Sequence, residues 1–284
     1  MYTAKIENRS GDVYILNGDE AVWQIASITG LNPPQGLINT TTIVGLDGAV
    51  FNSAKLETRN IVITVRITGN AEQNRLQLYR AFRTKEWCRF YYSNDSVDVW
   101  IDGYVESVEC DLFQKAEQAQ ISIICPQPHL IGAEEIVKDI SGITDMFSFP
   151  FAIEAAGVSF SDLSGADYAI LHNSGDVVTG FVISVFARST VTAPIIYNAV
   201  TNEAFRVKGT LEAGHTLTID TRTGSHRLTI TTPSGEVTNA LHRKQKGGPW
   251  LQLQPGDNYI AYSAEAGAAA MLVTLRHNDL YVGV

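Results

Sequence analysis

The sequence predicts a mainly β protein with two domains, and three observations support this fold class. Apolar and polar residues alternate over short runs in both halves of the chain, and this period of two places one face of a strand on a core. Turn motifs rich in Gly, Asn and Asp separate the runs, as they do between the strands of hairpins. Only one segment has the apolar spacing of a convincing helix. A chain of 284 residues is long enough for two domains of ordinary size.

The chain begins with short predicted strands. Residues 2–28 are β-prone and are broken by turn motifs at residues 8–12 and 17–19. Residues 30–36 contain Pro33 and Pro34 and are expected to be irregular. Residues 40–44 are expected to form the next strand, and Asp47-Gly48 predicts a hairpin turn that leads into another.

Residues 59–68 (RNIVITVRIT) form the clearest predicted strand. Ile61, Ile63, Val65 and Ile67 share one face of this strand. A slip of one residue would turn these four apolar side chains into water, so the register of the strand is well specified.

A helix is predicted directly after this strand. Asn70 can cap it, and Gln73 completes a pair that resembles a capping box. An apolar stripe at helical spacing is expected to pack on the sheet, and it consists of Leu76, Leu78, Tyr79 and Phe82. Arg75, Arg80 and Arg83 would form a solvated face or, alternatively, a contact with another subunit.

The stretch from residue 97 to residue 128 is predicted to be an antiparallel meander that closes the first domain. It contains three alternating segments, with a tight turn expected at Asp102-Gly103 and a longer turn at residues 113–117. Pro126 and Pro128 remove backbone donors and end the sheet.

The composition changes between residues 131 and 149, where Gly132, Ser141-Gly142 and Pro150 interrupt any long element. This predicts an N-terminal domain of residues 1–138 and a C-terminal domain of residues 139–284. In the second domain, a hairpin is expected around residues 223–225, with closing strands at residues 258–262 and 271–276. Short strands with such spacing predict a β-sandwich or barrel.

Charge and cysteine content limit the possible functions. The formal net charge is −9, whereas proteins that bind nucleic acid through phosphate neutralisation are usually basic. No apolar run reaches the roughly 20 residues needed to span a bilayer, and the N-terminus lacks the pattern of a secretory signal. Cys88, Cys110 and Cys125 are too widely spaced for a disulfide framework or zinc site and are expected to be reduced and buried.

Motifs for catalysis, metals and cofactors are missing. The six histidines show no metal-ligand spacing, and no GxSxG or phosphate-cradling glycine loop is present. Glu106 and Glu109 could pair as catalytic carboxylates, but a solvated face is the simpler interpretation. We therefore predict no enzyme activity, no catalytic, cofactor-binding or metal-binding residue, and no cofactor.

Two surface features suggest alternatives. The basic segment 242–248 is expected to be an exposed loop and could contact an anionic polymer. Trp250, Tyr259, Tyr262 and Tyr281 could stack on sugars if their rings were exposed, although aromatic residues in strands usually pack inside.

Several phrases of the chain resemble a known family. IDGYVESVE followed by QISIICPQPHL is similar to the end of the N-terminal domain of siphophage distal tail proteins, the Dit-like baseplate hub proteins. NSGDVVTGFVISV, LEAGHTLTIDTRTG, WLQLQPGDNYIAY and LRHNDLYVGV resemble the C-terminal domain of the same family, in the same order. The resemblance covers most of the chain.

The resemblance implies a structural virion protein at the end of a phage tail tube. The N-terminal domain would form a ring, a hexamer, with one short helix in an antiparallel sandwich or barrel-like sheet. The C-terminal domain would be a β-sandwich similar to a carbohydrate-binding module. Implied partners are further copies of the chain, the tail tube protein, the tape-measure protein, and tail-associated hub, fibre or receptor-binding proteins.

The implied location is the virion tail, after synthesis in the bacterial host cytoplasm. DNA would pass through the ring without specific binding, and no membrane contact is implied. The alternative function is a carbohydrate-binding module that recognises host-surface glycans.

Overall fold

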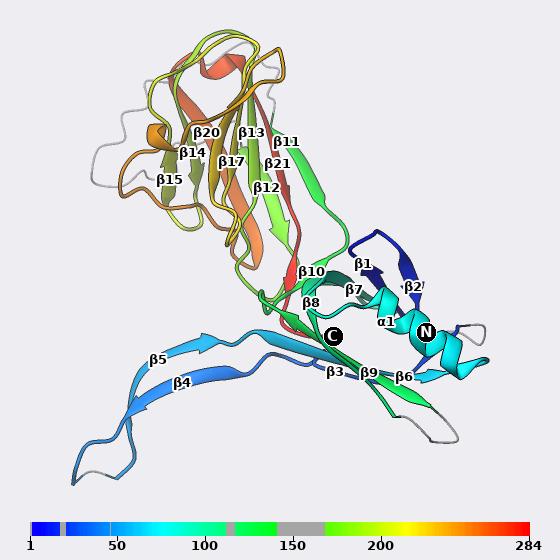
Figure 1. Cartoon of the computed structure of the whole chain (residues 1–284). Coiled ribbons are helices and arrows are strands. Elements are labelled where there is room, and N and C mark those ends of the chain that lie inside the picture. Colours follow the sequence, from blue (N-terminus) through cyan, green and yellow to red (C-terminus); the bar gives the residue numbers. More distant parts are fainter. Residues whose placement is uncertain (1, 18–20, 46, 112–116, 141–167) are drawn as a thin grey trace. The chain divides into compact units, whose positions relative to one another are not determined.

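The protein is described by a computed structural model that covers residues 2–17, 21–45, 47–111, 117–140 and 168–284. Over these residues the protein is mainly β with one α-helix, as the sequence predicts (Figure 1). The chain divides into two compact units, Met1–Glu134 with Leu280–Val284, and Glu135–Asp279. The predicted domain limits, 1–138 and 139–284, stay a prediction; residues 138 and 139 lie in a strand of the second unit.

The first unit is built on one nine-stranded antiparallel sheet. Seven of its strands follow the order β2-β1-β7-β8-β9-β6-β3, and β10 pairs with β8 and β22. The strands are β1 Thr3–Asn8, β2 Val13–Ile15, β3 Trp23–Thr29, β6 Arg59–Ile67, β7 Trp87–Ser93, β8 Asp98–Cys110, β9 Gln118–Cys125, β10 Leu130–Gly132 and β22 Leu280–Tyr281.

Alternation along the strands creates the core of this unit. The predicted face of β6 is confirmed, because Ile61, Ile63 and Val65 are completely buried and Ile67 is nearly so. β9 continues this apolar layer with Ile121 and its neighbours at every second position. Branched apolar side chains on a pleated sheet therefore set which face is inside.

The sheet curls until its two edges meet. Ile25 N on β3 donates to Leu16 O, just after β2, over 2.9 Å. The rings of Tyr14 and Trp23 lie 5.1 Å apart, one from each edge strand. The contact makes the sheet barrel-like and reduces the unpaired edge that an open sheet would expose.

The turn predicted at Asp102-Gly103 is wrong. β8 runs without interruption through these residues, and Gly103 pairs with Cys88 on the neighbouring strand. A Cβ added at Gly103 would lie 2.5 Å from Cγ2 of Ile123. The glycine therefore allows close packing inside a strand instead of a turn. The turn predicted at residues 113–117 lies outside the described residues, apart from Glu117.

Helix α1 (Ala71–Ala81) follows β6 as predicted, and the Asn70 side chain accepts a hydrogen bond from Gln73 N over 3.3 Å. Only part of the predicted stripe faces the core. Leu78 and Phe82 are buried, whereas Leu76 is 45% exposed and Tyr79 is 37% exposed. The side of the helix that packs is selected by an aromatic cluster in which Trp23 lies against Phe82.

A separate two-stranded sheet belongs to the first unit. β4 (Gly36–Thr41) and β5 (Val50–Leu56) pair only with each other among the described strands. The hairpin predicted at Asp47-Gly48 is confirmed. The preceding strand begins at Gly36 and ends at Thr41, so the predicted range of 40–44 was too late.

The second unit has the two-sheet architecture of a β-sandwich. Its six-stranded sheet has the order β11-β21-β13-β17-β18-β19, and its five-stranded sheet has the order β12-β20-β14-β15 with β16 beside β14. The strands are β11 Ile136–Ile140, β12 Tyr168–Asn173, β13 Val182–Ala187, β14 Val191–Asn198, β15 Glu203–Arg206, β16 Thr210–Leu211, β17 Thr216–Asp220, β18 Arg227–Thr231, β19 Val237–Asn239, β20 Gly256–Ala266 and β21 Met271–His277. Short 3₁₀ helices occupy Leu241–Arg243 and Ala268–Ala270.

Apolar residues from both sheets form the core of the second unit. Phe181 and Ile183 come from the region of β13, and Ile196, Phe205 and Ile260 come from the other sheet. The predicted hairpin around residues 223–225 joins β17 to β18. The predicted closing strands are also present, but β20 and β21 lie in different sheets.

Candidate interaction surfaces

The β4–β5 hairpin is the most unusual surface of the first unit. Every residue of both strands is exposed. Figure 1 shows the hairpin as an arm that extends away from the curled sheet of its unit. An isolated two-stranded hairpin is only marginally stable in water. Because both strands of this arm are exposed, packing against the rest of the unit adds little to its stability.

Large apolar side chains cover this arm. Ile38 and Phe51 are each 63% exposed. The exposed apolar residues of the arm are Leu37, Ile38, Ile43, Val44, Val50, Phe51 and Leu56. So many exposed large apolar side chains on one element often mark a contact with another molecule. The hairpin is therefore the strongest candidate for an interaction surface.

Sequence reasoning missed this role because the arm lacks a clean alternating pattern. Asn, Ser, Thr and Lys are mixed with the apolar residues along both strands. A strand in which neither face is fully apolar is a poor candidate for a core strand, and this mixed pattern is visible in the sequence. The pattern did not show that both strands would be exposed along their whole length.

A second candidate surface, which is polar and aromatic, lies on the face of β7 and β8 that is turned away from the core. Arg89 pairs with Asp102 over 2.7 Å, and its guanidinium lies 3.9 Å from the centre of the Trp100 ring. On the same face, the Tyr91 hydroxyl donates to Glu7 Oε2 over 2.6 Å. These contacts order the outer side of the sheet.

The two carboxylates singled out from the sequence lie on the same strand. Glu106 and Glu109 are both exposed on β8. Glu106 accepts a hydrogen bond from the Ser122 hydroxyl on the next strand over 2.8 Å. A strand-to-strand hydrogen bond accounts for this contact.

The histidines occur in different surroundings. Within the described ranges, no group of three or more His, Cys, Asp and Glu side chains is placed to hold a metal ion. His172 Nδ1 lies 2.6 Å from Asp257 Oδ1 at the surface. His277 is buried, and this burial lowers its pKa although Asp279 acts in the opposite direction.

The cysteines behave as small apolar residues. Cys88 and Cys125 are buried and free, and burial raises the pKa of each thiol to about 12. Cys110 is half-buried and also free. Thiols with raised pKa values are poor nucleophiles at neutral pH.

The basic segment 242–248 is only partly exposed. Arg243 Nη1 donates to Thr210 O over 2.9 Å, and Lys244 lies 5.3 Å from the ring centres of both Phe205 and Trp250. Burial lowers the pKa of Lys244. Two of the positively charged side chains in this segment, Arg243 and Lys244, therefore make contacts within the second unit.

The four aromatic residues considered for sugar stacking lie in different surroundings. Trp250 is half-buried and stacks on His226 with a ring separation of 4.4 Å. Tyr262 packs against the core of the second unit, and Tyr259 lies 5.9 Å from the Tyr168 ring. Tyr281 belongs to the first unit.

The arginines of the helix are divided between two surroundings. Arg75 pairs with Glu117 over 3.2 Å, whereas Arg80 and Arg83 are exposed. In the part of the chain that the structure describes, no helix is long and apolar enough to cross a membrane.

Comparison with known proteins gives matches to both halves of the chain. Residues 174–281 match the family described as "Siphovirus-type tail component, C-terminal domain". Residues 18–125 match the family described as "Phage tail protein RIFT-related domain". A search of curated proteins gave no match.

Solved phage structures share the fold. A crystal structure of the SPP1 Dit protein, described as a paradigm of the hub adsorption apparatus in phages that infect Gram-positive bacteria, is similar with a TM-score of 0.70. The identity is 13%, and the match covers 99% of each chain. A structure of the phage P2 baseplate in its activated conformation with Ca matches with a TM-score of 0.53 and 10% identity, over 98% of each chain.

The two family matches occur in the order expected for one protein, and the full-length fold agrees with them. The chain belongs to the siphovirus-type tail component (Dit) family of phage tail proteins.

Proposed function

We propose that this chain forms a closed homo-oligomeric ring, a hexamer, at the end of a phage tail tube. In this ring the first unit is the builder, and the second unit carries or steadies the tail-associated hub, fibre or receptor-binding proteins. The ring joins the tube to the host-adsorption apparatus. Its channel passes the tape-measure protein and then DNA, which it does not bind specifically.

The observation that carries the proposal is the exposed β4–β5 hairpin. Among the described strands, none pairs with the hairpin as a third, and Ile38 and Phe51 are each 63% exposed. Burying such side chains in a contact contributes about 1.5–3 kcal/mol for each large apolar residue. A head-to-tail ring requires two different complementary patches on each subunit, and the arm supplies one of them to the next copy.

The acidic balance of the chain supports a passive channel. The formal net charge is −9, and like charges weaken binding of the phosphate backbone. A ring made from such subunits would let DNA pass with little retention. The tail tube and tape-measure proteins are proposed as the neighbours at either end of this channel.

The ring can be tested by multi-angle light scattering on a size-exclusion column at two protein concentrations. We expect a species of about six times the mass of one 31.0 kDa chain. Negative-stain electron microscopy of the same fraction should show closed rings. A monomer at both concentrations, with no rings by microscopy, would contradict the proposal.

A charge placed on the arm should separate assembly from folding. Phe51→Asp is expected to convert the ring to monomers, because it puts a carboxylate into the proposed apolar contact. Val200→Asp is the matched control, since Val200 is 47% exposed in the second unit. Circular dichroism should be unchanged in both variants. An intact ring with Phe51→Asp would show that the arm does not carry the contact.

A further inference from the structure

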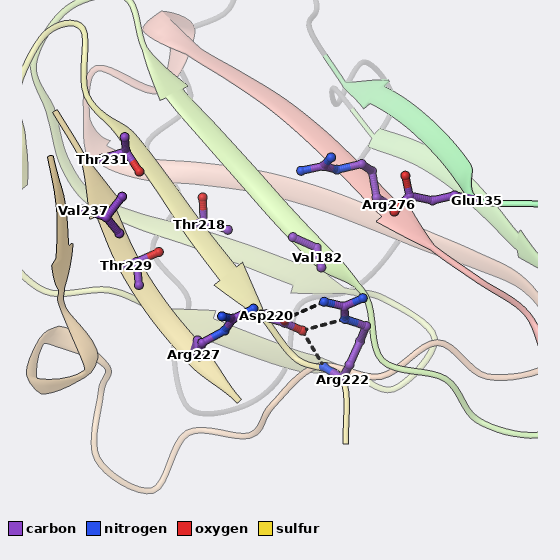
Figure 2. A pocket seen from close by; sticks show the side chains of 10 residues that line it. All are labelled: Glu135, Val182, Thr218, Asp220, Arg222, Arg227, Thr229, Thr231, Val237 and Arg276. Atoms are coloured by element: carbon purple, nitrogen blue, oxygen red, sulfur yellow. Dashed lines mark hydrogen bonds and ion pairs between the residues drawn. The ribbon is translucent and has the colours of Figure 1, made fainter. Parts of the chain in front are cut away.

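The outer face of the six-stranded sheet in the second unit contains a pocket with a volume of about 410 Å³. This size falls within the range of small-ligand pockets, roughly 300–1,000 Å³. Strand register places a row of neighbours across it, because Arg276 pairs with Val182, Val182 with Asp220, and Asp220 with Arg227. Figure 2 shows these side chains on the same face of the sheet.

Asp220 anchors the positive charges of the pocket. Its side chain is only 3% exposed, and its Oδ2 accepts hydrogen bonds from Arg222 Nη2 over 2.8 Å and from Arg227 Nη2 over 3.2 Å. Arg222 Nε also donates to Asp220 Oδ1 over 3.0 Å. Burial by itself would raise the pKa of Asp220, but the hydrogen bonds from the two arginines hold it below its ordinary value. The carboxylate therefore holds two of the guanidinium groups that line the pocket (Figure 2).

Arg276 provides a donor that the fold does not use. Its Nε atom is buried, and among the described residues it has no hydrogen-bond partner. A buried donor without an acceptor costs about 1–3 kcal/mol. Arg276 also lines the pocket, so its guanidinium group can meet an anion bound there, and a small shift of the side chain would let Nε share that acceptor.

The pocket also has an excess of positive charge. Three guanidinium groups line it together with the carboxyl groups of Asp220 and Glu135, so three positive charges face two negative ones. This local excess occurs in a chain with a formal net charge of −9. Guanidinium groups recognise carboxylates and phosphates through paired N–H donors.

Hydroxyl groups complete the lining. Thr218 and Thr229 lie opposite each other on β17 and β18 and both line the pocket. A threonine hydroxyl can donate to and accept from a sugar hydroxyl. We propose that this pocket binds an anionic sugar, with its carboxylate or phosphate on Arg222, Arg227 and Arg276 and its hydroxyls on the threonines.

An acidic peptide would use the guanidinium groups but would have less use for the threonine hydroxyls. A pocket lined by both kinds of group fits one compact, hydroxylated ligand better than an extended peptide. The sugar is therefore the occupant to which we commit. This binding does not depend on ring formation, so a monomer and a ring would both bind.

Isothermal titration calorimetry on the full chain tests the site. The probes are glucuronate for a carboxylate source, glucose 6-phosphate for a phosphate source, and glucose as the neutral comparison. We expect saturable binding of at least one anionic sugar, weaker at higher ionic strength, and no binding of glucose. The stronger of the two anionic probes identifies the charged group.

Two variants report on the arginines. Arg276→Gln and Arg227→Gln should each raise the dissociation constant about tenfold or more. Arg188→Gln is the matched control, because Arg188 is exposed in the same unit and does not line the pocket. It should bind like the unchanged protein.

Three results would overturn the proposal. The first is that neither anionic sugar binds saturably, and the second is that both pocket variants keep the affinity of the unchanged protein. The third is that inorganic phosphate binds as tightly as the sugar phosphate. Tight binding of an oligoglutamate peptide with none of the sugars would also overturn it and would indicate a protein partner. Loss of the ring in Phe51→Asp with retained sugar binding would separate this site from the assembly function.

Discussion

At the scale of single residues, Arg59 shows how a charge can be placed inside a β protein. It is 2% exposed, and burial lowers the pKa of its guanidinium. The side chain donates to four backbone carbonyl oxygens, those of Pro128 over 2.6 Å, Gly30 over 2.6 Å, Asn32 over 2.8 Å and Val282 over 2.7 Å. A buried cation needs such partners, and here they tie together loops that are distant in sequence.

Replacing Arg59 by methionine is therefore expected to destabilise the first unit strongly. Arg59→Met leaves the four carbonyl groups without this donor, and we expect the free energy of unfolding to fall by about 3 kcal/mol or more. Urea denaturation followed by tryptophan fluorescence measures the change. Arg66→Met on the same strand is the control, because Arg66 is exposed, and its effect should stay within about 0.5 kcal/mol. Equal losses for the two variants would refute the role given to Arg59.

At the scale of elements, β8 shows how close packing overrides a local turn signal. Asp102-Gly103 resembles a hairpin turn, but the glycine lies in a strand between β7 and β9. A side chain at this position would meet Ile123 Cγ2 at 2.5 Å and Cys125 Sγ at 3.0 Å. The missing Cβ is thus a packing feature of the sheet.

Gly103→Ala should reduce stability by about 1–3 kcal/mol, because the added methyl group overpacks the space beside Ile123. Thermal unfolding measured by circular dichroism provides the test. Gly36→Ala is a matched glycine in a strand, and nothing lies within 4 Å of its added Cβ. The expected change for Gly36→Ala is small. If Gly103→Ala were as stable as Gly36→Ala, the packing explanation would be wrong.

At the scale of the whole molecule, the chain enters the second unit after Glu134 and returns to the first at Leu280. The returning residues are integrated into the first unit by several contacts. β22 pairs with β10, and Val284 N donates to Leu31 O over 3.2 Å. The last residues of the chain therefore stabilise the unit that its first residues build.

Deletion of residues 280–284 should loosen the first unit selectively. Backbone amides of β10 and of residues 30–32 should exchange faster in hydrogen–deuterium exchange measured by mass spectrometry, since they lose their hydrogen-bonded neighbours. Amides of β13 and β17 in the second unit serve as the internal control and should keep their protection. Uniformly faster exchange in both units would contradict the assignment of these residues to the first unit alone.

The sequence alone determined the features that depend on local pattern. Alternation in residues 59–68 predicted the buried face of β6, Asn70 and Gln73 predicted the start of α1, and the phrases in both halves predicted the family. These features depend on neighbours in sequence or on recurring motifs, and both are visible without coordinates.

Only the tertiary structure decided which surfaces and polar residues meet. It placed four carbonyl groups around Arg59 and brought Arg276 into one pocket with Asp220 and Arg227. In the part of the chain that the structure describes, it also left the β4–β5 arm without a third strand. The same physical reason applies to all three. Each depends on pairings between distant segments, and such pairings are set by strand order and packing rather than by the pattern of any one segment.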